Sequence, residues 1–433
     1  MTVQPPSSGR FIATRSIPFF PPYLTDTLFS RGVGHSAGVR PLRSIHTMIP
    51  SRVDIAVIGG GPAGSLTARF LANSGYEVCL VERRSFPRET LCGEFISHEV
   101  LETLKECGLD PEFHALRPAH ISKVKVCPIR GRAVTTDLGF TAFGVQRGVF
   151  DRMLLESAKR QGVQVIQPAD AEEIVRSGDR FSIHVKSAAG DHTVSARWCV
   201  GAYGKSGALD KKLGRGHVAM RSGVNGVKVH VPVAVLSACD PGEVVLFSGR
   251  NMYCGLNIVN DGVATLCYLE RRTSHDLPLR ARFRELAAVN PGFAAVMTER
   301  GHGAIASAAI HGTGNIFFGR RDVVHNGMFM VGDAARVIAP LAGDGIGMAA
   351  QGARILGSVF GKRRRNAMTD DEMARDYERL WSNAFAARVR HAYVLQKILL
   401  SGGAMRVGGA MLRSFPGMLG AAVRFTRSQG SSL

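Results

Sequence analysis

The sequence predicts a mixed α/β fold in which a parallel-sheet unit is interleaved with an antiparallel-sheet unit and followed by C-terminal helices. Three observations predict this fold. The first is an apolar strand that runs into a glycine-rich turn and a helix, between Val53 and Glu82. The second is a series of strand-like segments over residues 227–269, with a strong hairpin signal at Asn260–Gly262. The third is a helical pattern that starts at Asp371.

The length and composition allow one large domain or two interleaved domains with a sizeable core. No run of apolar residues reaches transmembrane length. The eight cysteines form no C-x-x-C pair, which argues for a reducing, cytoplasmic compartment and against a zinc site or a four-cysteine iron–sulfur cluster. We therefore predict no metal centre.

The net charge of +19 is concentrated at the two ends of the chain. Residues 1–52 carry six arginines against Asp26 alone, and residues 379–433 carry eight Lys or Arg and no acid, which leaves +6 (19 − 5 − 8) for the rest. No aromatic-interleaved basic motif accompanies this charge, so nucleic-acid binding is not expected. The basic C-terminal region, residues 366–433, instead suggests docking or a peripheral membrane contact.

Residues 1–50 are rich in Arg, Ser, Pro and Gly and nearly free of acid. They fit either an organelle transit peptide or a mispredicted upstream start, with Met48 as the true initiator. Pro18, Pro21 and Pro22 interrupt the helical pattern that a transit peptide needs, which favours the second alternative. In both cases we expect a disordered extension outside the fold.

The turn after the first strand reads Gly59-Gly60-Gly61-Pro62-Ala63-Gly64 and has G-x-G-x-x-G spacing. Gly59 permits the tight turn, Gly61 lets a pyrophosphate approach the backbone, and Gly64 allows the helix to pack close to the strand. The helix N-terminus, with Pro62 and Ala63, supplies free N–H groups and a partial positive charge for phosphates. This context is typical of a Rossmann-type dinucleotide-binding unit.

Glu82 ends the second strand of this unit, where a carboxylate can accept hydrogen bonds from both hydroxyls of a ribose. The same charge would repel a 2′-phosphate, so a tightly held NADP is not expected at this position. Arg83 follows directly and opens the loop of residues 83–93. We include it among the candidate cofactor-binding residues.

A second glycine-rich stretch, residues 331–352, lies far along the chain. A strand ends at Gly332-Asp333, a turn passes through Pro340, and Gly343-Asp344-Gly345-Ile346-Gly347 opens a helix. This stretch resembles the ribityl-binding motif of the FAD-dependent aromatic hydroxylase and geranylgeranyl reductase superfamily, whose members are similar to class A flavin monooxygenases. The resemblance implies that Asp333 binds the ribityl chain and that the helix N-terminus at Gly343–Gly347 stabilises reduced flavin.

Two further matches support the resemblance, which covers residues 52–365. Arg147, before Phe150 and Asp151, is similar to the arginine of an R-x-x-F-D-x-x-L segment that reaches the cofactor in this superfamily. Cys92 and Gly93 resemble a C-G element that lies near the flavin in the reductase-like branch. A solvated arginine and a small buried cysteine are the alternative interpretations of these positions.

The resemblance implies an FAD-binding domain interleaved with a substrate domain. We assign residues 51–92, 146–215 and 303–365 to the FAD-binding domain, and residues 93–145 and 216–302 to the antiparallel substrate domain. The substrate domain would cover the flavin ring and hold an apolar molecule. Its candidate lining residues, for which core packing is the favoured alternative, are Phe247, Tyr253, Leu256 and Ile258.

The chain departs from each named branch of the superfamily. Tyr203, in Gly201-Ala202-Tyr203-Gly204, replaces the acid of the hydroxylases' G-A-D-G motif. The W-x-W-x-I-P signature of flavin halogenases is absent, and of the Y-x-W-x-F-P element of isoprenoid reductases only Tyr253 is present. His230 and His325 have no partner visible in the sequence and are expected to be core or surface residues.

We therefore expect an FAD-dependent oxidoreductase that acts on an apolar small molecule resembling an isoprenoid, a polyketide or an aromatic compound. Flavin hydride transfer and flavin-hydroperoxide oxygenation are both compatible with the motifs, and NAD(P)H is a candidate electron donor. The flavin carries the chemistry in either reaction, so no catalytic side chain is predicted. The alternative is a flavin-binding electron relay that docks to a partner or a membrane surface.

Overall fold

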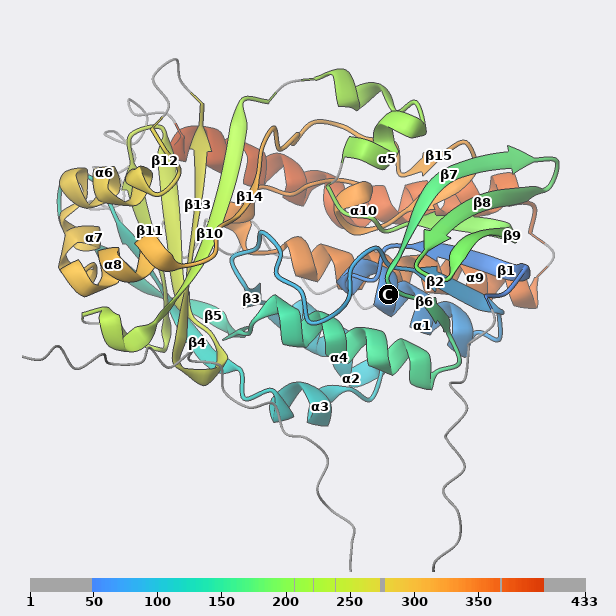
Figure 1. Ribbon diagram of the computed structural model, residues 1–433, viewed down its shortest axis with the longest axis horizontal. Helices are drawn as coiled ribbons and strands as arrows, with labels where there is room; N and C mark the ends of the chain where they lie inside the picture. The colour runs from blue at the N-terminus through green and yellow to red at the C-terminus, as the bar shows by residue number, and fades with distance from the viewer. Residues whose placement is uncertain are drawn as a thin grey trace, which may run out of the picture. The chain divides into compact units, whose positions relative to one another are not determined.

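The computed structural model describes residues 49–400, apart from residues 206, 221, 238, 273–276 and 367 and the side chain of Leu399. The predictions made for residues 1–48 and 401–433 lie outside the described residues. Within the described part, two eight-stranded sheets lie apart from each other, with helices between and around them (Figure 1). No described helix is both long enough and apolar enough to cross a bilayer.

The first sheet is built around β1 (Arg52–Ile58), the apolar strand that precedes the glycine-rich turn. It pairs in parallel with β2 (Val78–Val81) on one side and β9 (Gly190–Gly201) on the other. The strand order β15-β16-β9-β1-β2-β6, with the β7–β8 hairpin attached through β9, confirms the predicted Rossmann-type unit. The remaining bounds are β6 Gln164–Ile166, β7 Ala169–Ser177, β8 Arg180–Ser187, β15 Val324–His325 and β16 Met328–Met330.

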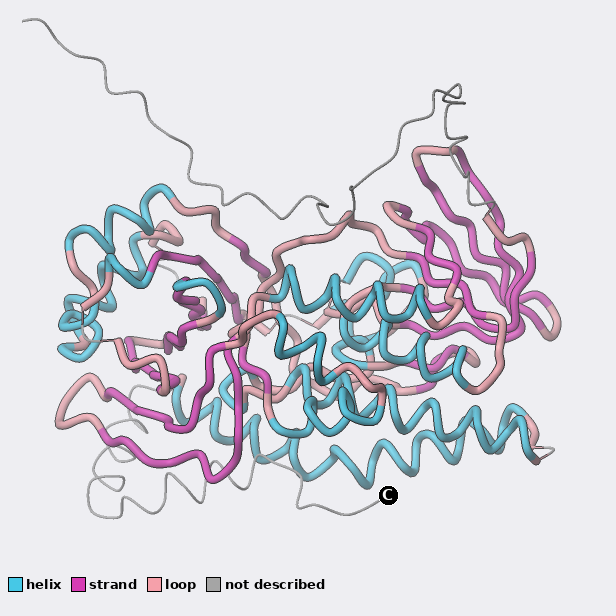
Figure 2. Tube along the Cα trace, turned by 90° about the horizontal axis from the view of Figure 1, so that it is seen from below, coloured by secondary structure: helices cyan, strands magenta, loops and turns pink. Residues whose placement is uncertain are grey.

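Helices bury the apolar side chains of this sheet. α1 (Pro62–Asn73) follows β1 directly and packs against α4 (Arg147–Arg160) and α9 (Gly345–Arg365). α9 and α10 (Asp370–Leu399), the two longest described helices, pack against each other (Figure 2). A capping box at Thr369 begins α10 and satisfies backbone N–H groups that would otherwise lack partners.

The second sheet has the order β14-β10-β13-β12-β11-β4-β5-β3 and is antiparallel except where β11 runs parallel to β4. The predicted turn at Asn260–Gly262 joins the antiparallel strands β12 and β13. Side chains alternate between the two faces, so one face packs on α6, α7 and α8 and the other is free to line a site. The bounds are β3 Phe95–Ile96, β4 Ala119–Cys127, β5 Val134–Gly144, β10 Val224–Pro232, β11 Glu243–Gly249, β12 Met252–Ile258, β13 Val263–Arg271, β14 His311–Thr313, α6 Ala281–Val289, α7 Pro291–Val296 and α8 Glu299–Ser307.

Two segments have contacts outside the domain proposed for them. α2 (His98–Glu106) and α3 (Asp110–Ala115), expected in the substrate domain, share an apolar cluster with α1, α4 and α9. β14, expected in the FAD-binding domain, pairs with β10 of the second sheet. An amphipathic pattern or a three-residue strand does not identify the neighbour that buries it, so the sequence could not place these segments.

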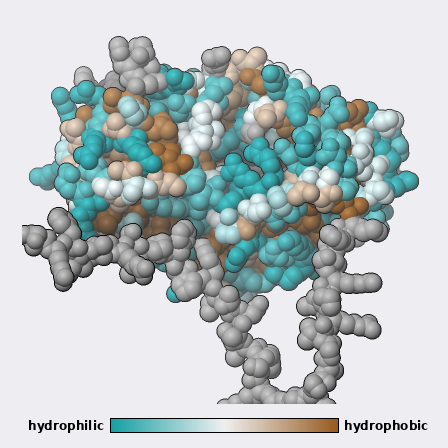
Figure 3. Space-filling model, viewed as in Figure 1, coloured by the Kyte–Doolittle hydropathy of each residue, from teal (hydrophilic) through white to brown (hydrophobic). Residues whose placement is uncertain are grey.

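The face of the molecule seen in Figure 3 is largely hydrophilic, with apolar residues in separate patches, as is normal for a folded surface.

The short helix α5 (Gly207–Lys212) follows β9 and lies in the connection from the first sheet to β10.

Candidate functional site

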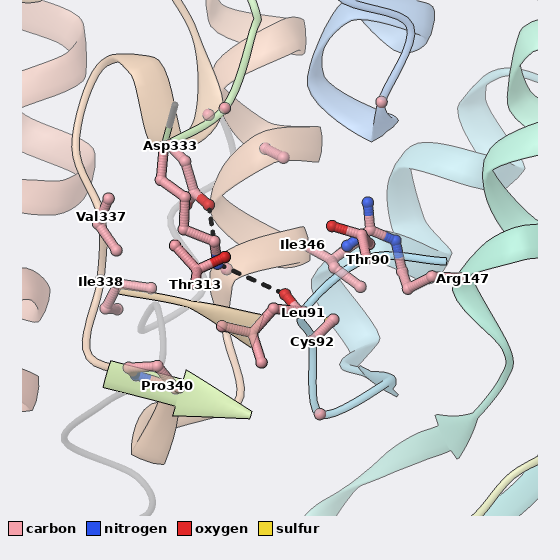
Figure 4. Close-up of a pocket in the computed structure, with 18 of the residues that line it drawn as sticks. Thr90, Leu91, Cys92, Arg147, Thr313, Asp333, Val337, Ile338, Pro340 and Ile346 are labelled. Atoms are coloured by element: carbon pink, nitrogen blue, oxygen red, sulfur yellow. Dashed lines mark hydrogen bonds and ion pairs between the residues drawn. The ribbon is translucent and has the colours of Figure 1, made fainter. Parts of the chain in front are cut away.

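A cavity of about 900 Å³ has walls from both sheets and from the loops between them. Its size is that of a cofactor or ligand site. All the predicted cofactor-binding residues line this cavity except Gly64 and Gly347. The loop around Cys92 faces the stretch from Asp333 to Pro340 across it (Figure 4).

Gly64 and Gly347 instead lie where neighbouring atoms leave no room for a side chain. A Cβ on Gly64 would lie 1.8 Å from the carbonyl oxygen of Gly59, and a Cβ on Gly347 would lie 2.3 Å from a carboxylate oxygen of Asp344. Gly59 has a φ of 110°, in the region that favours glycine. The close approach at Gly64 holds α1 against β1, so the N-terminus of α1 opens on the cavity without a side-chain cap.

Glu82 fixes the backbone of the first turn. Its carboxylate oxygens accept hydrogen bonds from the N–H groups of Gly60, at 2.7 Å, and Arg84, at 2.8 Å. Nε of Arg88 is 3.6 Å from Oε1 of Glu82, and a guanidinium nitrogen of Arg88 is the nearest atom, at 3.5 Å, to a Cβ built on Gly61. Burial lowers the pKa of Arg88. Arg88 thus places a cation beside the turn. In the sequence nothing distinguishes it from the neighbouring arginines.

Gly332 brings the second motif against the first. It has a φ of 60°, and a Cβ there would lie 2.8 Å from the Cβ of Ala63 in α1. α9 begins at Gly345 without a side-chain cap, and the carboxylate of its N-cap residue Asp344 binds Nε of Arg388 in α10, at 2.8 Å. Two helix N-termini therefore open on one cavity, and neither has an acid in its first turn.

Lys205 connects the second motif to the loop on the other side of the cavity. Its Nζ is 3.7 Å from Oδ2 of Asp333 and 3.4 Å from the backbone oxygen of Leu91, the two contacts dashed in Figure 4. Both distances are long, so these acceptors hold the ammonium weakly. Lys205 was not among the sequence candidates; its position directly after Gly201–Gly204 was the available signal.

Tyr203, which replaces the acid of the hydroxylase motif, forms a hydrogen bond with the carboxylate of another residue. Its hydroxyl donates to Oδ1 of Asp210 in α5, at 2.7 Å, and accepts from Arg215, at 3.1 Å. Asp210 is buried and also pairs with Arg321, which donates to the backbone oxygen of Asp333 at 3.1 Å. Burial raises the pKa of Tyr203, which keeps its hydroxyl neutral. Asp210 therefore places a carboxylate near the loop that carries Tyr203. Through Arg321, it also connects this loop to the second motif.

Arg147 is not a solvated surface residue. Its guanidinium donates to both carboxylate oxygens of Asp151, at 2.7 and 2.9 Å. Burial acts against the charge of Arg147, but the neighbouring Asp151 outweighs burial and raises its pKa. The Cys92 thiol lies beside this guanidinium, and its sulfur accepts a hydrogen bond from the backbone N–H of Glu94, at 3.3 Å. The backbone N–H of Arg147 donates to the Glu94 carboxylate, at 2.8 Å.

Glu94 is the centre of a buried charged cluster. Its carboxylate accepts from Nζ of Lys228, at 2.9 Å, and lies 2.5 Å from both Nε2 of His230 and Oγ1 of Thr265. Burial acts to raise the pKa of Glu94, but the His230 hydrogen bond and the Lys228 charge lower it to about 2. Glu89, Glu94 and His230 are close enough together to hold a metal ion, but the Lys228 ammonium already binds both carboxylates.

His230 and His325, whose partners were not visible in the sequence, each have a partner in the structure. His230 binds Glu94, and Nε2 of His325 lies 2.9 Å from the backbone oxygen of Leu213. Lys228 and His230 are two residues apart in β10, so their side chains share the face opposite Val227 and Val229. Two basic side chains at this spacing in an otherwise apolar strand were the signal in the sequence.

The second sheet gives the cavity a largely apolar wall. Tyr253 lines it, together with Leu246 and Leu269 from the neighbouring strands. Phe247 is among the lining residues, although its ring packs on Phe293 with centroids 5.1 Å apart in the core on the other face of the sheet. Leu256 belongs to the same core and does not line the cavity, so the core-packing alternative holds for Leu256. Ile258 is buried and is not among the lining residues. Leu395 and Ile398 of α10 also contribute to the wall.

A sequence profile that describes an FAD binding domain matches residues 52–379, well over half of the chain. The chain belongs to this FAD-binding domain family. Its cofactor is FAD, and it is an FAD-dependent oxidoreductase rather than a non-catalytic relay. The cavity suits this cofactor, because uncapped amides at two helix N-termini face it and the backbone at Gly61 is open to a phosphate.

Relatives of this FAD-binding protein include reductases and halogenases. It is similar to digeranylgeranylglycerophospholipid reductase 3 of Methanosphaera stadtmanae, with 26% identity over 75% of this chain and 81% of that protein. It is 25% identical to the menaquinone reductase of Mycobacterium tuberculosis H37Rv, over 86% of each chain. It is 32% identical to the flavin-dependent halogenase armH1 of Armillaria mellea, but this match spans 38% of this chain and only 33% of that protein.

Solved structures share the fold. A geranylgeranyl bacteriochlorophyll reductase-like protein of Thermoplasma acidophilum aligns with a TM-score of 0.68 at 18% identity, over 87% of this chain and 99% of that one. A myxobacterial chondrochloren halogenase aligns with a TM-score of 0.66 at 19% identity, over 85% of this chain and 90% of that one. Identities this low establish the fold alone, and they confirm the predicted fold class.

Proposed function

We propose that this FAD-dependent oxidoreductase is a reductase whose substrate is an apolar molecule with a reducible C=C bond or quinone ring, such as an isoprenoid. The observation that carries the proposal is the continuity of one cavity from both cofactor motifs to the apolar face of the second sheet. The sequence relatives named above that match along most of the chain are reductases, whereas the sequence of the halogenase armH1 matches less than half of it.

We assign the adenosine end of the cofactor to the first motif. The N-terminus of α1, with Gly59 and Gly61, would hold the pyrophosphate, because its backbone N–H groups are uncapped. Glu82 would accept hydrogen bonds from the ribose hydroxyls. Its two hydrogen bonds with backbone N–H groups leave lone pairs on the carboxylate available for them. Arg88 adds a cation beside Gly61 and suits a phosphate oxygen.

We assign the flavin end to the second motif. Asp333 would bind the ribityl hydroxyls, and the uncapped N-terminus of α9 would face the edge of the ring that becomes negative on reduction. Bound FAD supplies the two-electron chemistry. Cys92 and Arg147 line the opposite side, where their contacts with Glu94 and Asp151 hold them in position. The apolar wall keeps water from the reacting atoms.

Oxygenation is the second candidate. It is favoured by the fold shared with a halogenase and by the apolar wall, since a dry pocket protects reactive species from hydrolysis. The replacement of the G-A-D-G acid by Tyr203 counts against a hydroxylase of the usual kind, although Asp210 provides a carboxylate nearby.

Oxygen dependence separates the two candidates. The purified protein is reduced under argon with dithionite, NADH or NADPH, and a naphthoquinone or a polyprenyl alcohol is then added. A reductase reoxidises its flavin with one of these probes in the absence of oxygen. Reoxidation that needs oxygen, together with incorporation of an oxygen atom into the probe, would establish the oxygenase instead. The same reductions identify the donor, which we propose to be NAD(P)H.

The proposal includes a cytoplasmic protein with a peripheral membrane contact through its basic C-terminal region. All eight cysteines are free thiols, which supports a reducing compartment. The absence of acids from residues 379–433 supports attraction to an anionic surface.

A further inference from the structure

The outward face of α10 changes character along the helix. Its first turns expose side chains of both charges: Asp371, Glu372, Arg375 and Glu378. Its last turns expose only apolar, basic and histidine side chains: Arg390, His391, Tyr393, Val394, Lys397 and Ile398. Seven large hydrophobic side chains are exposed in the described part of the chain, and three belong to these turns: Tyr393 (38%), Val394 (51%) and Ile398 (39%). Such a face is typical of a helix lying in a membrane interface.

The same turns belong to the cavity wall. Leu395 and Ile398 line the cavity, and Leu400 is buried in an apolar cluster with Tyr253 and Leu269 of the second sheet. Ile398 is both a wall residue and an exposed residue. The cavity therefore reaches the surface beside the apolar end of α10.

We propose that the last turns of α10 dock on an anionic lipid surface, and that the apolar substrate enters the cavity from this surface past Leu395 and Ile398. The inference rests on the proposed function for the class of substrate, and it names the partner and the entrance of the same site. A hydrocarbon chain that enters here exchanges a lipid environment for an apolar wall and avoids transfer through water.

The charge around this surface selects anionic lipid. Residues 379–433 hold eight Lys or Arg and no acid, and each basic residue near an anionic bilayer strengthens binding about fivefold. Nζ of Lys397 lies over the Tyr393 ring, 4.6 Å from its centre, in a cation–π contact that places a positive charge within this exposed surface.

Vesicle binding tests the inference. Full-length holoprotein is mixed with phosphatidylcholine vesicles, with or without phosphatidylglycerol, and the bound fraction is measured by co-sedimentation. Val394→Glu is the test variant. Val175→Glu is the matched control, because Val175 is 49% exposed in β7 of the first sheet. We expect wild type and Val175→Glu to bind the anionic vesicles, and Val394→Glu to bind about tenfold more weakly. Flavin content verifies that each variant is folded.

Three results would overturn the inference: no binding by wild type, equal binding with and without phosphatidylglycerol, or equal binding by wild type and Val394→Glu. Lys397→Glu is a second variant, exposed in the same turns, and should also weaken binding to the anionic vesicles. Retention of wild type on an immobilised acidic peptide without vesicle binding would assign the surface to a protein partner instead.

The assay contains neither substrate nor electron donor, so it is independent of the proposed function. A protein that binds vesicles but reduces no probe contradicts only the proposed function. A protein that reduces a soluble naphthoquinone but ignores vesicles contradicts only this inference.

Discussion

Nε2 of His230 lies 2.5 Å from Oε2 of Glu94, although 136 residues separate them in the sequence. The contact joins the cavity loop that carries Cys92 to β10 of the second sheet. Glu94 has a φ of 58°, an uncommon conformation for a residue other than glycine, and four hydrogen bonds to its carboxylate hold it there. The loop geometry at the site therefore depends on a buried ionic cluster.

Glu94→Gln should lower the free energy of unfolding by about 3 kcal/mol, because Lys228 would keep its charge in a buried site with one carboxylate fewer. Urea denaturation at neutral pH measures the change. The double variant Glu94→Gln/Lys228→Met should recover part of the loss, since no unpaired charge then remains. A single variant as stable as wild type would show that the cluster contributes nothing to stability.

The stabilisation from Glu94 should depend on pH in one direction. Its pKa is about 2 in the folded protein, below the value of an ordinary glutamate, so the unfolded state binds the proton more readily. The contribution is therefore fully present above the unfolded pKa of about 4.3 and is lost as pH falls toward 2. The stability difference between wild type and Glu94→Gln should shrink over this range, and a constant difference would contradict the assignment.

Gly64→Ala should abolish flavin retention and destabilise the protein, because its Cβ would lie 1.8 Å from the carbonyl oxygen of Gly59. Relief of this clash requires α1 to move away from β1, which displaces the helix N-terminus from the cavity. Flavin absorbance and thermal unfolding measure both effects. Gly352→Ala in α9 is the control: its Cβ meets nothing within 4 Å, and it should leave stability unchanged or raise it by up to about 1 kcal/mol.

Asp333→Asn should weaken FAD binding at least about tenfold through loss of a charged acceptor, and it should leave the stability of the apoprotein nearly unchanged. The Asp333 side chain is partly exposed, and its ion pair with Lys205 is long. Titration of apoprotein with FAD by fluorescence gives the affinity. Asp322→Asn, on an exposed residue, should bind FAD like wild type. An Asp333→Asn protein that holds FAD normally would remove Asp333 from the ribityl site.

Gly255→Leu should block the substrate half of the cavity without loss of flavin. A Cβ on Gly255 would make only ordinary contacts, 3.7 Å from Leu246 and 3.8 Å from Cys267, so the larger side chain projects into the cavity. We expect a change in stability of no more than about 1 kcal/mol and a loss of anaerobic flavin reoxidation by the probe. Unchanged reoxidation would place the substrate elsewhere.

The cofactor motifs were predictable because each has a local cause. Gly59 sits in a turn whose backbone requires glycine, and the strand and helix patterns beside it are strong. The Glu94 cluster was not predictable in the same way, because Glu94 comes from a loop and its partners come from two strands that lie 134 to 171 residues further along the chain. Neither periodicity nor spacing shows that two such segments meet. Leu256 illustrates a third case, since the choice between the two faces of a strand depends on where the covering helices pack.

Arg388 lies near the end of the described chain and binds Asp344, the N-cap residue of α9, at the end of the cavity where we propose that the flavin binds. The cofactor site is therefore incomplete until α10 has been synthesised and has folded onto α9. Nascent chains that end before this helix would present the first motif without a finished cavity. We expect flavin capture to follow translation rather than accompany it, and cellular FAD supply would then act on finished chains as a late step in their maturation.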